Sequence, residues 1–337
     1  MPRTARIDTP GLLHHVIGRG IEQRDIFPTK TDYADFIQRI ETCLEKSPNE
    51  ILAWALMPNH FHLLIRSGPQ GMVSFMRRLM TGYAGGFNAR HKRSGHLFQN
   101  RYKSIVCDEA AYLLELVRYI HLNPLRGGLV KTMTELGNFP YTGHRALLGY
   151  GKTPWQSLEA VLNHFSSTEK TARKRYLEFV TEGVSQGRRE DLMGGGLGRS
   201  GGGRPREVRL DHRGAGQLFD ARVLGSGEFV EKVLEKVEKT ESLQRDIARQ
   251  NITMDDIAAK VAGAMKIDVQ WLYLRNRTRK VSEAKSLLTF LATEYLGKNN
   301  AEMARTIKMS PAAAGRARQR GMVLAQGLNV GAWFKVN

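Results

Sequence analysis

Residues 51–66, ILAWALMPNHFHLLIR, contain two apolar runs separated by a turn pair, and they decide the fold of the first part of the chain. The runs 51–57 and 60–66 predict two β-strands joined at Pro58-Asn59, a dipeptide typical of turns. Side chains at positions i and i+2 of a strand lie on one face, so His60 and His62 are expected side by side. Two imidazoles in an otherwise apolar strand make this pair a candidate functional site.

The flanking sequence predicts further strands and helices on both sides of this hairpin. Apolar periodicity and turn residues predict strands at 11–20 and 97–106 and helices at 30–46, 71–91 and 109–122. Asp108 is placed to cap the last helix, and Pro124 is placed to end it. The order strand, helix, strand, strand, helix, strand, helix predicts an α+β fold in which helices pack on an antiparallel sheet.

The chain has 337 residues, which is more than one typical domain. We predict a first domain at 1–150, a helical extension with a Gly-rich linker at 151–227, and a helical domain at 228–337. The linker is the stretch 194–203, GGGLGRSGGG. The apolar runs are too short to span a bilayer, and the N-terminal residues show no secretion signal. The two cysteines, Cys43 and Cys107, match no disulfide framework. These features predict a cytoplasmic protein without a membrane partner.

The formal net charge of +18 indicates a polyanionic partner. Residues 51–107 contain eight Lys or Arg and no Asp or Glu, and acids are absent again from residue 303 to the end. A generally solvated basic surface would distribute its charges more evenly. Two separate regions of one sign therefore predict two nucleic-acid contact surfaces and a nucleoid-associated location.

A second group of polar residues lies at 115–130, ELVRYIHLNPLRGGLV. Tyr119 and Asn123 are four residues apart and share a face if the segment is helical. A tyrosine hydroxyl can attack a phosphodiester, and two imidazoles with an amide oxygen can hold a divalent ion. The plainer interpretations are that the histidines are half-buried and hydrogen-bonded, that Tyr119 packs, and that Asn123 caps the helix. Tyr112 is a competing tyrosine, seven residues before Tyr119.

Three motifs occur in order, MPNHFHLLI at 57–65, GHLFQNRYKSI at 95–105 and YIHLNPLRGGLV at 119–130. Together they resemble the single-tyrosine HUH transposases, and more closely the REP-associated tyrosine transposases. The resemblance covers about residues 5–150. It implies a ferredoxin-like antiparallel sheet with helices on one face, the HUH endonuclease type. It also implies DNA, single-stranded or folded into a hairpin-forming repeat, as the substrate.

The same resemblance implies roles for individual residues. A metal ion, Mg²⁺ or Mn²⁺, would be held by His60, His62 and Asn123. Tyr119 would cleave the strand and form a 5′-phosphotyrosine. Relatives of the insertion-sequence type build composite sites from two subunits, so a homodimer and delivery of Tyr119 from either chain both stay open.

Basic residues between the motifs are candidate DNA contacts, namely Arg77, Arg78, Arg90, Lys92, Arg93, Arg101 and Lys103. Tyr83, Phe87, Phe98 and Tyr102 are candidate stacking faces for bases. Near the C-terminus, helices are predicted from residue 281, from 300 after a capping box at Asn299, and from 311 after Ser310. This pattern predicts a helix-turn-helix, and the region resembles the DNA-binding domain of the replication initiator DnaA. Its basic helix carries Arg316, Arg318 and Arg320.

The sequence therefore predicts a metal-dependent endonuclease and strand transferase for single-stranded DNA, with a helical DNA-binding domain that also reaches duplex DNA. Two alternatives stay open. One is a non-catalytic DNA-binding regulator. The other is a metal-dependent ribonuclease or phosphodiesterase, which would not need Tyr119.

Overall fold

The computed structural model describes residues 6–68, 71–187, 189, 192, 207–210, 216–249, 252–275, 278–328, 330 and 333. The chain divides into two compact units, Met1–Val233 and Leu234–Asn337, and each is considered by itself. The predicted linker at 194–203 lies outside the described residues. Within the described residues, no helix combines the length and apolarity that a bilayer crossing requires.

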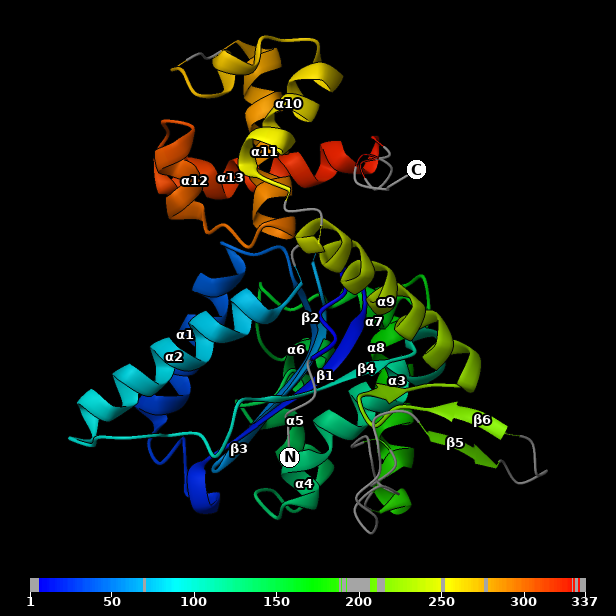
Figure 1. The fold of residues 1–337 in the computed structure, drawn as a ribbon. Helices are drawn as coiled ribbons and strands as arrows, with labels where there is room; N and C mark the ends of the chain where they lie inside the picture. The colour runs from blue at the N-terminus through cyan, green and yellow to red at the C-terminus, as the bar shows by residue number, and fades with distance from the viewer. Residues whose placement is uncertain are drawn as a thin grey trace. The chain divides into compact units, whose positions relative to one another are not determined.

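The first unit is built around a five-stranded sheet in the order β2-β3-β1-β4-β7 (Figure 1). Its strands are β1 Leu13–Arg19, β2 Glu50–Met57, β3 His60–Arg66, β4 Lys103–Cys107 and β7 Val223–Leu224. The first four strands alternate with α1 Lys30–Leu44 and α2 Val73–Arg90 in a βαββαβ order, which is that of the ferredoxin-like motif. A separate two-stranded sheet joins β5 Glu207–Leu210 to β6 Gly216–Phe219.

Helices cover both faces of the large sheet, so the prediction of helices on one face is wrong. Apolar residues of α1 and α2 pack with Val16, Trp54 and Phe61 on one face. The opposite face carries Leu13, Ala55, Leu64 and Ile105 and packs against α3 Glu109–His121 and later helices. Residues on one strand alternate between two apolar cores, which is why the strands read as continuous apolar runs rather than as alternating ones.

The sheet is mixed rather than purely antiparallel, because β7 pairs with β4 in parallel. The backbone amides of Val106 and Asp108 donate to the carbonyls of Arg222 and Leu224. Strand β7 is two residues long and comes from a distant part of the chain. Nothing in its sequence marks it as a sheet edge.

Local sequence explains most helix boundaries in this unit. Thr29 caps α1 and forms a capping box with Asp32, and the Asp108 side chain caps α3 by accepting from the amide of Ala110. Helix α2 runs through the glycines that weaken its pattern. Added Cβ atoms at Gly82 and Gly86 would each meet the Arg39 guanidinium at 2.8 Å. These glycines therefore leave room for the Arg39 guanidinium against α2.

The chain after α3 continues the core of the first unit. The short helices α4 Asn123–Arg126, α5 Met133–Asn138, α6 His144–Leu148 and α7 Glu159–Leu162 lead to the longer α8 Glu169–Glu182. Val161, Tyr176 and Val180 from this region are fully buried against α3 and the sheet. Short 3-10 helices lie at Ile21–Gln23, Gly183–Gln186 and Val269–Leu272.

The second unit is helical, as predicted. It contains α10 Met254–Met265, α11 Arg279–Tyr295, α12 Asn300–Thr306 and α13 Pro311–Gln326, and α9 Gly227–Arg249 leads into it from the first unit. The predicted caps are confirmed: Asn299 and Glu302 form a capping box, and the Ser310 side chain accepts from the amide of Ala313. Leu287, Leu291 and Ile307 belong to its separate apolar core.

Candidate active site

The two histidines of the central hairpin lie on one face of β3, as their spacing predicts. Their ring centroids are 5.1 Å apart. His60 pairs with Arg19 of β1, and His62 pairs with Ile17 of the same strand. His62 is only 1% exposed, whereas His60 at the end of the strand is partly exposed. The pair therefore has one member in the core and one at its edge.

A third histidine, His15 of β1, completes this group. Its ring stacks on His62 at a centroid distance of 5.2 Å, and its Nε2 lies 2.9 Å from Nδ1 of His62. Its Nδ1 lies 3.4 Å from the carbonyl oxygen of Leu192. Sequence reasoning missed His15 because its contact with His62 depends on the register of β1 against β3. The adjacent pair His14-His15 was the available signal, since one of two successive residues must face the same side as His62.

Tyr119 of α3 lies against the same group of rings. Its ring is 5.9 Å from His62 and 5.9 Å from His15, edge-on to both. All three rings belong to one chain. Tyr119 is 5% exposed and belongs to the core that α3 forms with the sheet. The competing Tyr112 makes no ring contact with either histidine among the interactions of the described residues.

The helix break predicted at Pro124 brings two more side chains to Tyr119. Asn123 begins α4, and its Nδ2 donates to the carbonyl of Tyr119 at 2.9 Å. The amide nitrogen thus caps α3, and Oδ1 is the atom with which Asn123 could bind a cation. The Arg126 guanidinium lies 5.7 Å from the centre of the Tyr119 ring, and its Nη2 donates to the carbonyl of Gly183.

Burial keeps the histidines neutral at physiological pH. It lowers the pKa of His60 and of His15 to about 4, and it lowers that of His62 well below the ordinary value. The positive charge of Arg19 lowers the pKa of His60 further. Neutral imidazoles retain a lone pair for a metal ion, so this donor set fits a divalent cation.

The cation would need ligands besides the two imidazoles. Among the residues that the structure describes, no group of three or more His, Cys, Asp or Glu side chains could hold a metal. An amide oxygen, water and a phosphate oxygen are the ligands that such a site would leave room for. A pair of imidazoles completed by oxygen ligands is a mixed nitrogen and oxygen donor set of the kind that first-row divalent cations accept.

The predicted DNA-binding residues of the first unit have different surroundings. Arg77 and Arg101 are exposed and line a groove of about 860 Å³ between α2 and the loop 95–102. Met76, Met80 and Leu97 form its apolar wall. The loop meets the C-terminal end of β1 next to His60, because the amide of Gln99 donates to the carbonyl of Arg19, the residue opposite His60.

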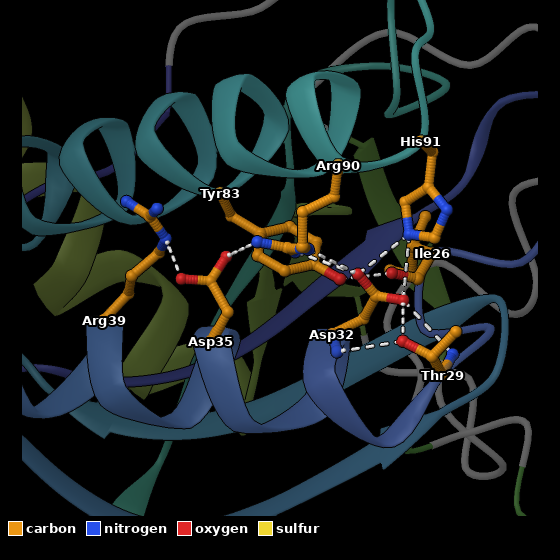
Figure 2. A network of polar contacts seen from close by, with 8 residues as sticks. All are labelled: Ile26, Thr29, Asp32, Asp35, Arg39, Tyr83, Arg90 and His91. Atoms are coloured by element: carbon orange, nitrogen blue, oxygen red, sulfur yellow. Dashed lines mark hydrogen bonds and ion pairs between the residues drawn. The ribbon is translucent and has the colours of Figure 1, made fainter.

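Arg90 instead belongs to an ion-pair network between α1 and α2, shown in Figure 2. Its guanidinium pairs with Asp32 at 2.9 Å and with Asp35 at 2.8 Å. His91 also contacts Asp32, whose side chain is fully buried. These ion pairs explain the position of the Arg90 side chain without a contact to DNA.

The other basic positions are also distinguished by their contacts. Arg78 donates to Ser74 one turn earlier on α2. Arg93 lies over the Phe87 ring at 5.7 Å, Lys92 is exposed after the end of α2, and Lys103 begins β4. Arg77 and Arg101 are thus the two predicted contacts that share a groove.

Three of the four predicted stacking aromatics are core residues. Tyr83, Phe87 and Tyr102 are no more than 6% exposed, and the Tyr83 hydroxyl donates to the carbonyl of Ile26. The prediction that they offer faces to bases is wrong, because each ring fills the apolar core under α2. Phe98 is partly exposed.

In the second unit, the predicted basic helix is α13. Arg316 is exposed. Arg318 pairs with Glu294 of α11 at 3.0 Å, and Arg320 donates to the Ser286 side chain at 3.4 Å. Among the described residues, Arg316 is therefore the one of the three whose guanidinium makes no hydrogen bond or ion pair.

Comparisons with known proteins bear on the first unit. Residues 9–123 match the family described as Transposase IS200 like. A solved structure described as a REP associated tyrosine transposase bound to a REP hairpin resembles the chain with a TM-score of 0.38 and 20% identity. That match covers 46% of this chain and 90% of the other, and a likeness at this level carries no functional conclusion. No curated protein matches the chain.

The family match begins before β1 and ends at Asn123, so it contains the histidines and Tyr119. Residues 9–123 are thus an IS200-like transposase domain. The match ends at the first residue of α4 and leaves α5–α8, β7 and the whole second unit outside it.

Proposed function

We propose that the IS200-like transposase domain of this chain is a metal-dependent endonuclease and strand transferase for single-stranded DNA, with Tyr119 as nucleophile. The placement of the Tyr119 ring 5.9 Å from His62 within one chain carries this proposal. It brings a phenol beside two neutral imidazoles, which are the groups required for phosphodiester transfer through tyrosine. It also supports delivery of Tyr119 by the chain that holds the histidines.

In the proposed reaction, the Tyr119 oxygen attacks the phosphorus of a DNA backbone phosphate. A phosphorus–oxygen bond to Tyr119 forms as the bond to the 3′ oxygen breaks. The phenol loses its proton, and the leaving 3′ oxygen gains one. The product is a 5′-phosphotyrosine and a free 3′ hydroxyl. Because one phosphoester replaces another, a 3′ hydroxyl can reverse the reaction without ATP.

Four side chains have proposed roles in this reaction. His60 and His62 would hold the divalent cation, with Asn123 Oδ1 as a further ligand. When bound, the cation supplies polarisation of the scissile phosphate and neutralises its charge. The Arg126 guanidinium, which faces the Tyr119 ring, is placed to stabilise negative charge on the phenol as its proton leaves.

The basic groove is the proposed path of the strand. Arg77 and Arg101 attract phosphates, and the loop 95–102 joins the groove to the strand end that holds His60. We propose a hairpin-forming repeat as the substrate. We also propose that Arg316 contacts duplex DNA from a helix-turn-helix formed by α12 and α13. A homodimer is a further proposal. The similarity of the C-terminal region to the replication initiator DnaA stays a prediction.

The test is formation of a covalent adduct. Purified protein is incubated with Mn²⁺ and a labelled oligonucleotide that carries a hairpin, and the products are separated under denaturing conditions. The wild type and Tyr112→Phe should become labelled, whereas Tyr119→Phe should not. Hydrolysis that persists in Tyr119→Phe but is lost in His60→Ala would instead support a phosphodiesterase. Hairpin binding without any adduct or hydrolysis would support a non-catalytic regulator.

A further inference from the structure

We propose that Asn59 and His15 set the tautomers of the two metal-binding histidines, so that both present an unprotonated Nε2 to the cation. This proposal rests on the proposed function for the identity of the ligand. It assigns positioning roles to two residues that the family match does not single out. It is derived from hydrogen bonds whose donors and acceptors are fixed by chemistry.

The chain of contacts to His60 begins at the carbonyl of Gln23. That oxygen can only accept, so the Asn59 atom 3.1 Å from it is the amide nitrogen Nδ2, which donates. The orientation of the Asn59 amide is therefore fixed, and its Oδ1 faces Nδ1 of His60 at 2.6 Å. Because Oδ1 can only accept, His60 must carry its proton on Nδ1.

The chain of contacts to His62 begins at the carbonyl of Leu192. This oxygen accepts from Nδ1 of His15 at 3.4 Å, so a neutral His15 has no proton on Nε2. The Nε2 of His15 must then accept from Nδ1 of His62, 2.9 Å away. His62, like His60, carries its proton on Nδ1. Two backbone carbonyls in different parts of the chain impose the same tautomer on neighbouring rings.

The consequence for metal binding is direct. A neutral imidazole has one nitrogen with a proton and one with a lone pair, and only the second can bind a cation. The opposite tautomer of His62 would set two lone pairs against each other at His15, in a region where His15 and His62 are at most 1% exposed. Water cannot readily replace the lost partner there. Loss of a hydrogen-bond partner of a metal-binding histidine typically lowers metal affinity by roughly 10- to 100-fold.

The first experiment reads the tautomers in the full-length protein without metal. Histidines are labelled with ¹⁵N, and long-range ¹H–¹⁵N correlation spectra at pH 7 distinguish Nδ1–H from Nε2–H rings. His60 and His62 are assigned by single replacement. Both are expected in the Nδ1–H form. An Nε2–H form at either histidine would overturn the proposal for that histidine.

The second experiment measures Mn²⁺ affinity by calorimetry. His15→Phe keeps a buried aromatic ring but cannot accept from His62, and it should weaken Mn²⁺ binding by about 10- to 100-fold. Asn59→Ala should act similarly, and Asn59→Asp, which keeps an acceptor for His60, should restore much of the affinity. His14→Phe is the matched control. His14 is the neighbouring, equally buried residue of β1, and it contacts Ser104 rather than His62. Equal affinities for the His14 and His15 variants would overturn the role of His15.

The outcomes separate this proposal from the proposed function. Protein that forms the covalent DNA adduct but holds either histidine in the Nε2–H form would overturn the tautomer assignment alone. A second outcome is that both rings are in the Nδ1–H form and His15→Phe weakens Mn²⁺ binding, but no adduct forms. This outcome would confirm the positioning roles and overturn the proposed nuclease activity.

Discussion

The ring of Tyr119 stands edge-on to the ring of His62 at 5.9 Å, and both residues belong to one chain. Helix α3 carries the tyrosine across the face of the sheet on which the histidine lies. The two residues come together when the first unit folds, which supports the proposal that Tyr119 serves the histidines of its own chain. The predictions below follow from this arrangement.

Arg126 should affect the chemical step more than DNA binding. Its guanidinium faces the Tyr119 ring, and its Nε and Nη1 atoms are buried without a hydrogen-bond partner among the described residues. Arg126→Gln should slow adduct formation on the order of 100-fold, because a charged donor near the developing phenolate is lost. Single-turnover assays at saturating hairpin DNA measure this rate. Arg78→Gln, which alters an arginine bonded to Ser74, is the control.

The groove arginines should affect binding and its salt dependence. The double variant Arg77→Gln, Arg101→Gln removes two charges from the groove, so its affinity for single-stranded DNA should fall. The slope of log affinity against log salt should become shallower by about 1.4, which corresponds to two phosphate contacts on a single strand. Fluorescence anisotropy between 50 and 200 mM salt, as about the useful range, measures both quantities. An unchanged slope would place the DNA elsewhere.

The network in Figure 2 should matter for stability and not for chemistry. Asp32 is fully buried and contacts Arg90 and His91, so Asp32→Asn removes the buried carboxylate from the network and leaves Arg90 only Asp35 as an ion-pair partner. The free energy of unfolding should fall by about 2 kcal/mol, less than for a fully buried pair because Arg90 is partly exposed. Asp35→Asn, whose side chain is nearer the surface, should cost about 1 kcal/mol or less. Urea denaturation compares the two. Equal losses would show that burial of Asp32 is unimportant.

Acid should destabilise the first unit through its buried histidines. Burial lowers the pKa of His144 to about 4, against about 6.5 in an unfolded chain. Between these values only the unfolded chain binds the proton. The stabilisation is therefore complete above about pH 6.5 and is lost as the pH falls toward 4. His144→Asn should reduce the slope of unfolding free energy against pH by up to about 1.4 kcal/mol per pH unit. Urea denaturation at several pH values gives this slope, and an unaltered slope would contradict the assignment.

Local patterns were sufficient to predict the order of elements from β1 to α3, since the apolar runs are separated by turn residues and α1 and α3 begin at side-chain caps. They failed where contacts between distant residues decide the structure. The segment 97–102 has a strand-like composition, but it pairs only through an isolated bridge from Phe98 to Gly20, and β4 begins at Lys103. Strand β7 is too short to carry a pattern. The helices that cover the second face follow α3 in the chain, and their sequences do not indicate which face of the sheet they pack against.

The candidate site was predictable to a similar degree. The spacing of His60 and His62 revealed their common face, and the motif resemblance pointed to Tyr119. The roles of His15 and Asn59 depend on strand register and on the carbonyls of Leu192 and Gln23, which no spacing reveals. Tyr83, Phe87 and Tyr102 were candidate stacking faces but are core residues, because composition does not distinguish a groove from the core beneath it.

The dependence of the sheet on β7 has a practical consequence for protein engineering. An excised gene fragment that stops where the family match ends would leave β4 with a bare edge, and such edges recruit strands from other molecules and promote aggregation. It would also lack the Leu192 carbonyl. A transplantable version of this module must extend to about Val233, within α9, where the first compact unit ends.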